Sequence, residues 1–303
     1  MALEIGFAGI KMKNPTVLAS GFLGTDSAVL KRVAEEFGCG AATMKSIGPR
    51  ERMGHANPCV VEWEHGFLNA VGLPTPGYRN MEEEWKGLKK RGFPLIASIY
   101  GASVEEFEEV AKAVAKHKPD AIEVNISCPN TKKEGQVFGV CEESAALVVK
   151  AVKKEIGQLP LIAKLTPQAW NIGEIAKACE EAGADAICAI NTVAGMLINA
   201  EARKPVLANR FGGISGPAVK PIALKCVYQI YESVKVPILG MGGISNGRDA
   251  IEMVMAGATA IGIGSGIYYR GFGVFGKVCE EMEQWMQENG VKDLKEIRGV
   301  AHE

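Results

Sequence analysis

The sequence predicts an α/β fold, a single (β/α)8 or TIM barrel, and three observations support this prediction. Short apolar runs alternate with amphipathic stretches of helical length, and eight such runs can be counted along the 303 residues. The runs do not alternate with polar residues, as expected for parallel strands that are buried on both faces. Finally, the tripeptide Ala-Gly-Ala occurs at both 182–184 and 256–258, where a helix is expected to end before the next strand begins.

The predicted strands and helices follow one another along the whole chain. The strands are expected at 16–19, 41–45, 95–98, 121–125, 161–164, 186–191, 237–240 and 260–264. The helices are expected at 27–36, 104–116, 142–155, 172–182, 217–233, 247–255 and 275–288. Asp26 or Ser27 is suited to cap the first helix. An open doubly wound sheet is the alternative, but no Gly-x-Gly-x-x-Gly pattern follows the first strand.

Two segments are too long to be plain connections. Residues 46–93 follow the second predicted strand, and residues 191–216 follow the sixth. Both leave the carboxyl end of a strand, which is where barrel enzymes build their active sites. Long connections in compact domains are usually functional. We therefore expect one domain, residues 1–303, with an active site at the carboxyl ends of the strands.

The composition excludes several classes of partner. The chain is 47% hydrophobic and 23% charged, with a net charge of −1, which does not favour nucleic acid or an anionic membrane. The first fourteen residues include Glu4, Lys11 and Lys13 and lack the apolar core of a signal peptide. No apolar run reaches the length of a membrane span. We expect a cytoplasmic protein.

Glycine-rich turns follow the last two predicted strands. Gly242 and Gly243 come after the strand at 237–240, and Gly264 and Ser265 close the strand at 260–264. Glycine exposes backbone N–H groups, and barrels commonly bind phosphate at these two places. Either turn alone could be a tight turn and nothing more. The two together favour a ligand that carries a phosphate group.

Lysine and asparagine residues gather at the ends of other predicted strands. Lys45 and Lys164 end the second and fifth strands, which suggests that negative charge collects there, either on a reduced flavin or on a substrate carboxylate. Several amides are expected in loops at the same end, where they suit a planar ligand with alternating C=O and N–H groups. They are Asn69, Asn125, Asn130, Asn191 and Asn209.

Eight cysteines are present, and none forms a Cys-x-x-Cys pair. This argues against a zinc ribbon, a redox dithiol or an iron–sulfur cluster on this chain. Cys179, Cys188 and Cys226 lie in apolar-periodic stretches and are expected to be buried small hydrophobes. Cys128 differs, because it lies three residues past the fourth strand with no helical period around it.

Cys128 is the candidate catalytic residue. A thiol can act as a general base if its pKa is brought down from about 8.5 toward the working pH. The four histidines show no spacing that suggests a dyad with Cys128. The sequence therefore favours proton abstraction by this thiol over a cysteine hydrolase.

At these residues the sequence resembles the class 1 dihydroorotate dehydrogenases over almost its whole length. The motifs that carry the resemblance occur in the family's order, and they are Ala19-Ser20-Gly21, Lys45-Ser46-Ile47, Leu68-Asn69-Ala70-Val71-Gly72-Leu73, Asn125-Ile126-Ser127-Cys128-Pro129-Asn130, Lys164-Leu165-Thr166-Pro167, Ile190-Asn191-Thr192 and Gly242-Gly243-Ile244. The stretches 209–217 and 268–271 resemble the class 1B branch in particular. Ser98 departs from the pattern, since relatives often carry Asn there.

The resemblance implies an FMN-containing barrel that oxidises dihydroorotate to orotate in pyrimidine synthesis. The base would be Cys128, which would remove the C5 proton while hydride leaves C6 for the flavin. FMN would contact Ser20, Lys45, Ser46, Asn125, Lys164, Ile190 and Gly216, with its phosphate on Gly242, Gly243, Gly264 and Ser265. Substrate would contact Lys45, Asn69, Ala70, Val71, Gly72, Leu73, Asn125, Asn130, Asn191 and Thr192. No metal site is expected on the chain.

The class 1B resemblance also implies a partner. Such enzymes pair a homodimeric core with a subunit that carries FAD and a 2Fe-2S cluster and passes electrons to NAD, giving a heterotetramer. Several alternatives remain: a flavin barrel acting on another reduced pyrimidine such as dihydrouracil, a class 1A-type enzyme that uses fumarate, a flavin-free lyase or synthase that binds phosphate, and a non-catalytic assembly subunit.

Overall fold

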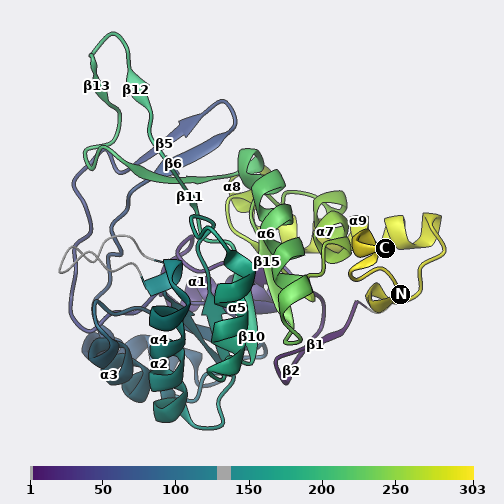
Figure 1. Ribbon diagram of the computed structural model, residues 1–303, viewed down its shortest axis with the longest axis horizontal. Coiled ribbons are helices and arrows are strands. Elements are labelled where there is room, and N and C mark those ends of the chain that lie inside the picture. Colours follow the sequence, from purple (N-terminus) through teal and green to yellow (C-terminus); the bar gives the residue numbers. More distant parts are fainter. Residues whose placement is uncertain (1–2, 128–137) are drawn as a thin grey trace.

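Eight parallel strands close into a barrel in the computed structural model, which describes residues 3–127 and 138–303 (Figure 1). The strands lie in the order β10-β15-β16-β3-β4-β7-β8-β9, and all eight neighbouring pairs are parallel. Their bounds are Thr16–Leu18 (β3), Ala41–Thr43 (β4), Leu95–Ile99 (β7), Ala121–Asn125 (β8), Leu161–Lys164 (β9), Ala186–Ala189 (β10), Ile238–Met241 (β15) and Ala260–Ile263 (β16). The prediction of a TIM barrel is confirmed.

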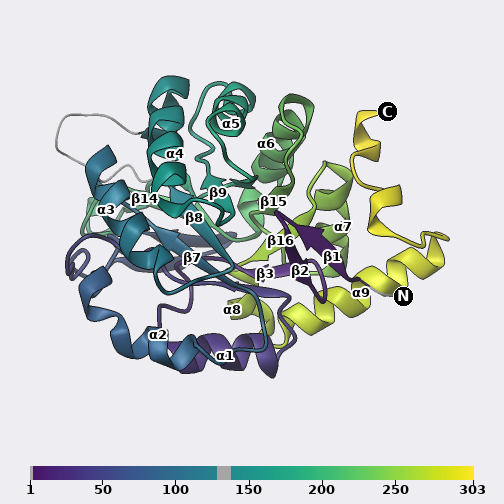
Figure 2. The same cartoon turned by 90° about the horizontal axis from the view of Figure 1, so that it is seen from below.

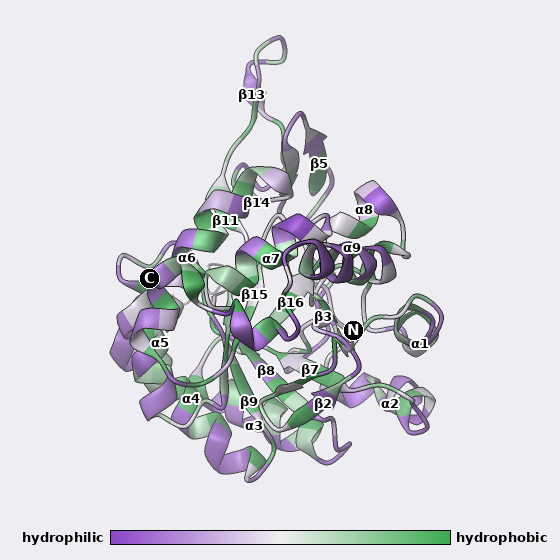
Figure 3. Ribbon diagram, turned by 90° about the vertical axis from the view of Figure 1, so that its right-hand side faces the viewer, coloured by the Kyte–Doolittle hydropathy of each residue, from purple (hydrophilic) through white to green (hydrophobic). Residues whose placement is uncertain are grey.

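Helices surround the barrel and bury their apolar faces against it (Figures 1 and 3). They are Ser27–Glu35 (α1), Glu82–Leu88 (α2), Val104–Ala115 (α3), Glu142–Ile156 (α4), Ile172–Glu181 (α5), Lys220–Ser233 (α6), Gly247–Met255 (α7), Gly266–Arg270 (α8) and Val274–Glu288 (α9). Within the described ranges, 3-10 turns add to them at Tyr78–Asn80, Phe138–Val140, Pro217–Val219, Leu294–Glu296 and Val300–His302.

Local signals explain where several of the helices begin. Asp26 accepts hydrogen bonds from the backbone N–H groups of Ala28 and Val29 and so caps α1, as its residue type predicts. Asn246 and Asp249 form a capping box at the start of α7. The helix predicted at 217–233 begins instead as a 3-10 turn, and its α-helical part starts at Lys220.

The barrel interior changes character along its axis. Its lower half is apolar, and the side chains that fill it include Val17, Ala41, Ile96, Ala121, Ile162, Ala186, Leu239 and Ala260. The hairpin of β1 (Ile5–Phe7) and β2 (Ile10–Met12) packs into the same cluster through Phe7, Ile10 and Met12, so it closes the amino end (Figure 2). Alternate residues of a strand face the same side. The next inward positions are therefore Thr43, Ser98, Glu123, Lys164 and Cys188, a polar layer directly above the apolar one.

The two long segments meet above the barrel. Strands β5 (Val60–Trp63) and β6 (Gly66–Asn69) come from the first segment, and β11 (Val193–Gly195) and β14 (Gly212–Ser215) come from the second. They form one antiparallel sheet in the order β11-β14-β6-β5. The hairpin of β12 (Ile198–Asn199) and β13 (Lys204–Pro205) projects beyond it (Figure 1). Both segments are thus more than connections, as predicted.

None of the helices in the described part of the chain is both long and apolar enough to cross a bilayer.

Candidate active site at the carboxyl ends of the barrel strands

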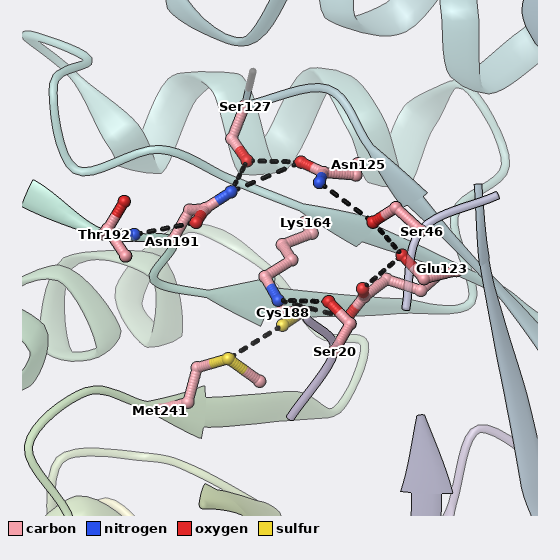
Figure 4. Close-up of polar contacts among 11 residues, drawn as sticks. Ser20, Ser46, Glu123, Asn125, Ser127, Lys164, Cys188, Asn191, Thr192 and Met241 are labelled. Carbon is pink, nitrogen blue, oxygen red and sulfur yellow. Dashed lines mark hydrogen bonds and ion pairs between the residues drawn. The ribbon is translucent and has the colours of Figure 1, made fainter. Parts of the chain in front are cut away.

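Strand register brings the predicted polar residues to one place at the barrel mouth. Lys164 at the end of β9 is the register partner of Asn125 on β8 and of Cys188 on β10. Ser98 on β7 is likewise the register partner of Glu123 on β8. Because adjacent parallel strands point equivalent side chains the same way, these groups converge in the barrel interior (Figure 4). The predicted location of the active site therefore contains a connected polar cluster.

Asn125 is the centre of a buried set of hydrogen bonds. Its Nδ2 donates to Ser46 Oγ at 3.2 Å, and its Oδ1 accepts from Ser127 Oγ at 2.7 Å and from Asn191 Nδ2 at 3.3 Å. Asn191 Nδ2 also donates to Ser127 Oγ, and Asn191 Oδ1 accepts from the backbone N–H of Thr192 at 2.8 Å. Two of the amides predicted to share a planar ligand, those of Asn125 and Asn191, are thus linked to each other.

A lysine–carboxylate pair lies beneath this set. Lys164 Nζ is 3.7 Å from Glu123 Oε2 and donates to Ser20 Oγ at 3.1 Å. The side chain of Glu123 is fully buried and that of Lys164 is 5% exposed. Ser98 Oγ donates to Glu123 Oε1 at 2.8 Å, whereas Oε2 accepts no hydrogen bond from any described residue. Glu123 is therefore held by one hydrogen bond and one ion pair.

The electrostatics of this pair keep Lys164 charged. Burial disfavours the ammonium, but the nearby Glu123 carboxylate outweighs it, so the pKa of Lys164 stands above its usual value. Cys188 is the neighbouring thiol. Burial raises the pKa of Cys188 well above its usual value against the opposing effect of Lys164, so the thiol stays neutral. Among the described residues, the charge of the Lys164 ammonium is thus balanced by Glu123.

Lys45 contributes a second cation near the mouth, just past the end of β4. Its side chain is half-buried, and burial lowers the pKa of its ammonium group. No hydrogen bond or ion pair engages this ammonium group among residues 3–127 and 138–303. A lysine in that situation is suited to bind an anion.

The turn with Gly242 and Gly243, one of the two predicted to bind phosphate, lies close to the backbone of neighbouring segments. A Cβ added to Gly243 would lie 2.8 Å from the backbone N of Lys220 and 3.0 Å from the carbonyl oxygen of Gly216. Gly243 also has φ +76°, and Gly242 has φ +131°. Only glycine fits such positions without strain. It follows that the turn after β15 lies next to the start of α6 and to Gly216. Gly264 differs, because a Cβ added there would lie 3.5 Å from the Cβ of Ala19 and would fit.

The segment Asn69–Leu73 lies beside the same mouth. Asn69 Nδ2 donates to the carbonyl oxygen of Gly213 at 3.2 Å, and the side chain of Thr192 packs against Gly213 from the other side. Asn69 ends strand β6, so the prediction that it lies in a loop was wrong; the antiparallel sheet carries it instead. Thr192 and Asn69 thus come together although they lie 123 positions apart in sequence.

Two predicted residues, Cys128 and Asn130, lie outside the described residues. Ser127 is the last described residue before them, and it is buried within the Asn125 cluster. The remaining cysteine predictions are confirmed, because Cys179, Cys188 and Cys226 are buried. Asn209 is exposed and donates to the carbonyl oxygen of Phe211, as an ordinary turn residue does.

Sequence reasoning missed Glu123 as a member of the site. The available signal was a charged residue inside an otherwise apolar strand, since buried charges are rare without partners. Ser98 was noticed only as a departure from the family pattern. Its role becomes visible once the register sets it beside Glu123.

Comparison with known proteins agrees with this geometry. The sequence pattern of the family described as dihydroorotate dehydrogenase matches residues 2–286. A protein of Methanosarcina mazei is 47% identical over 298 residues, which cover 97% of this chain and 94% of the relative. One of Methanocaldococcus jannaschii is 49% identical over 305 residues (99% and 98%), and one of Pyrococcus abyssi is 44% identical over 299 residues (99% of each). All three are named dihydroorotate dehydrogenase B (NAD(+)), catalytic subunit. This chain therefore belongs to the dihydroorotate dehydrogenase family.

Proposed function

We propose that this protein is the catalytic subunit of an NAD-linked dihydroorotate dehydrogenase, which oxidises dihydroorotate to orotate in pyrimidine synthesis. One observation carries the proposal. Two lysines and a linked set of amides converge at the barrel mouth beside a glycine cradle, in a chain of this family. Such a mouth suits a planar, anionic pyrimidine lying next to a phosphate-bearing cofactor. We further propose that residues 1–303 act as one domain.

The residues present fit FMN as the cofactor. At Gly216, Gly242 and Gly243, an added Cβ would meet neighbouring protein atoms at 2.8, 2.7 and 2.8 Å, so these positions require glycine. A glycine-rich turn at the carboxyl end of a barrel strand is suited to bind phosphate through its backbone N–H groups. The residues proposed to hold the phosphate are Gly242, Gly243, Gly264 and Ser265. Those proposed to hold the ring system are Ser20, Lys45, Ser46, Asn125, Lys164, Ile190 and Gly216. Bound FMN would supply the acceptor for the hydride that leaves C6 of the substrate.

Substrate binding is proposed for Lys45, the segment Asn69–Leu73, Asn125, Asn130, Asn191 and Thr192. The carboxylate of dihydroorotate is an anion, and Lys45 has an ammonium group that no described residue engages. The ring carbonyl and N–H groups call for donors and acceptors in alternation, which asparagine amides supply. Dihydrouracil lacks the carboxylate, so this arrangement favours dihydroorotate over it.

Cys128 is proposed as the general base. Its thiolate would take the proton from C5, so that the substrate loses one proton to sulfur and one hydride from C6, which forms the C5=C6 double bond of orotate. The neighbouring Ser127 is buried in the amide cluster, which supports a position for Cys128 at the same mouth.

Flavin absorbance tests the proposed half-reaction directly. The purified protein is expected to bind FMN and to turn yellow, and anaerobic addition of dihydroorotate should bleach the flavin band within one turnover. Dihydrouracil at the same concentration serves as the control and should leave the band in place. A colourless protein that cannot bind FMN, or bleaching by dihydrouracil alone, would overturn the proposal.

Electrons are proposed to leave through a second subunit. The relatives' name, catalytic subunit of an NAD(+) enzyme, supports a partner that completes the reaction. We propose a homodimeric core with two such partners, a heterotetramer, in which the partner carries FAD and a 2Fe-2S cluster.

A further inference from the structure

The hydrogen bonds of the active site form one continuous chain, and both of its ends have fixed polarity. The chain runs from the backbone N–H of Thr192 through Asn191, Ser127, Asn125, Ser46 and Ser98 to Glu123 (Figure 4). A backbone N–H can only donate, and a carboxylate can only accept. The groups between them are hydroxyls and amides, which can do both.

These two ends determine the direction of every bond between them. The carboxylate requires Ser98 to donate its only proton to Glu123, so Ser98 must accept from Ser46, at 2.9 Å. Ser46 has then used its own proton, so it must accept from the amide nitrogen of Asn125, at 3.2 Å. This turns Asn125 Oδ1 toward Ser127 and Asn191, which both donate to it. At the other end, Thr192 N–H fixes Asn191 in the matching orientation.

We propose that Glu123 is a positioning residue whose carboxylate fixes the direction of this chain and anchors the Lys164 ammonium, so that Asn125 and Lys164 both present hydrogen-bond donors to the bound ligands. The inference rests on the proposed function, because the ligands are those proposed for the mouth. Glu123 itself lies below the mouth with its side chain fully buried, and it acts only through Ser98 and Lys164.

The geometry explains why the carboxylate is needed there. Among residues 3–127 and 138–303, the chain uses one of the two N–H groups of Asn125 and leaves the other for a ligand. If Ser98 could accept instead of donate, Ser46 could donate toward Asn125 and would no longer hold its amide nitrogen, so Asn125 would be held from the side of Ser127 and Asn191 alone. Glutamine at position 123 can donate through its own amide, so it permits both directions. It also presents no charge to Lys164. Among the described residues, the titratable groups that act on Lys164 are Glu123 on β8 and Cys188 on β10, and the Cys188 thiol is neutral.

Orotate binding to the oxidised, FMN-loaded protein tests this inference, with FMN binding to the apoprotein as a second readout. In Glu123→Gln, the dissociation constant for orotate is expected to rise at least about tenfold at pH 7, the effect of losing one hydrogen bond to a charged group. The ratio of the orotate dissociation constant of the variant to that of the wild type should rise further toward pH 10. Without the Glu123 carboxylate, burial lowers the pKa of Lys164, and the lysine loses its charge at high pH. Because both proteins contain Lys45, the effect of its titration on orotate binding cancels in this ratio. FMN affinity of the apoprotein should show the same pH trend.

Two further variants separate the parts of the inference. Ser98→Ala breaks the chain but keeps the ion pair, so orotate should bind more weakly by a factor that does not depend on pH. Asp185→Asn is the matched control, because Asp185 forms a carboxylate–lysine pair with Lys153 at 2.6 Å and also accepts from the backbone N–H at the start of β9, at the opposite end of the barrel. It should leave orotate binding unchanged.

Equal orotate affinity in wild type and Glu123→Gln, within about twofold at every pH, would overturn the inference while leaving the proposed function intact. If Glu123→Gln does not fold, unchanged orotate affinity in Ser98→Ala would overturn the inference in the same way. A wild-type protein that binds FMN but not orotate would instead contradict the proposed function, and the inference would fall with it.

Discussion

Single residues decide what the barrel mouth can do, and the polar layer inside the barrel shows how. Ser98, Glu123 and Lys164 each stand two positions after an apolar inward-facing residue on the same strand, at 96, 121 and 162. The apolar layer below supplies the low-polarity surroundings in which an ion pair is strong. The amides above are then oriented by charges that never reach the surface. The chemistry proposed for the mouth thus depends in part on Ser98 and Glu123, which are not among the residues proposed to touch a ligand.

Cys128 provides the prediction that belongs to this scale. Replacing it with Ala removes the proposed base, so turnover of dihydroorotate should fall by about 10²- to 10⁴-fold. The FMN content and the melting temperature should stay at their wild-type values. Anaerobic stopped-flow measurement of flavin reduction gives the rate of this half-reaction directly.

Cys141 offers a matched control for that experiment, since its thiol is exposed. Cys141→Ala should reduce the flavin at the wild-type rate. Flavin reduction at an undiminished rate in Cys128→Ala would remove Cys128 from the mechanism.

The barrel elements were predictable because their sequence signals are local. The strands at 121–125 and 161–164 and the helix at 247–255 were predicted with their observed bounds, since apolar runs and capping residues mark them. The sheet above the mouth was not predictable. Its strands have three or four residues each, too few for a periodic pattern, and the pairing of β6 with β14 joins residues more than a hundred positions apart. Lys164 could be selected from its position, whereas Glu123 needed the register of β7 and β8.

The glycine cradle gives a prediction at the scale of elements. In Gly243→Ala, the methyl group would meet the backbone of Lys220 at 2.8 Å, at the junction of β15, α6 and the turn that precedes it. The substitution should weaken FMN binding to the apoprotein at least about tenfold, because the turn must move away from its phosphate-binding geometry. Titration of the apoprotein with FMN, followed by flavin fluorescence, measures the effect.

Gly157→Ala is the control for backbone strain alone. Gly157 also has a positive φ, +61°, but nothing lies within 4 Å of an added Cβ at the end of α4. This variant should lose stability by about 1–2 kcal/mol and keep its FMN affinity. Equal FMN affinities for Gly243→Ala and wild type would argue against a phosphate at that turn.

At the scale of the whole molecule, the two ends of the barrel have different tasks. The amino end is closed by the β1–β2 hairpin, whose Phe7 and Met12 fill the bottom of the barrel. The carboxyl end is polar and carries the four-stranded sheet, which joins segments from both halves of the chain. Substrate is therefore expected to enter and leave at the carboxyl end, since the amino end is packed with apolar side chains, and the electrons that it gives up would pass first to the flavin proposed there.

The last prediction concerns where those electrons go. The chain alone should be reduced by dihydroorotate but should not reduce NAD, because its relatives are named as the catalytic subunit of an NAD(+) enzyme, which implies a second subunit for that step. The complex with the electron-transfer subunit should form NADH, followed by its absorbance at about 340 nm, and Cys128→Ala in the same complex should form it 10²- to 10⁴-fold more slowly. A complete complex whose flavin is bleached by dihydroorotate, and which still forms no NADH, would exclude the NAD-linked branch. Oxidation of the same reduced protein by fumarate would then assign the acceptor instead.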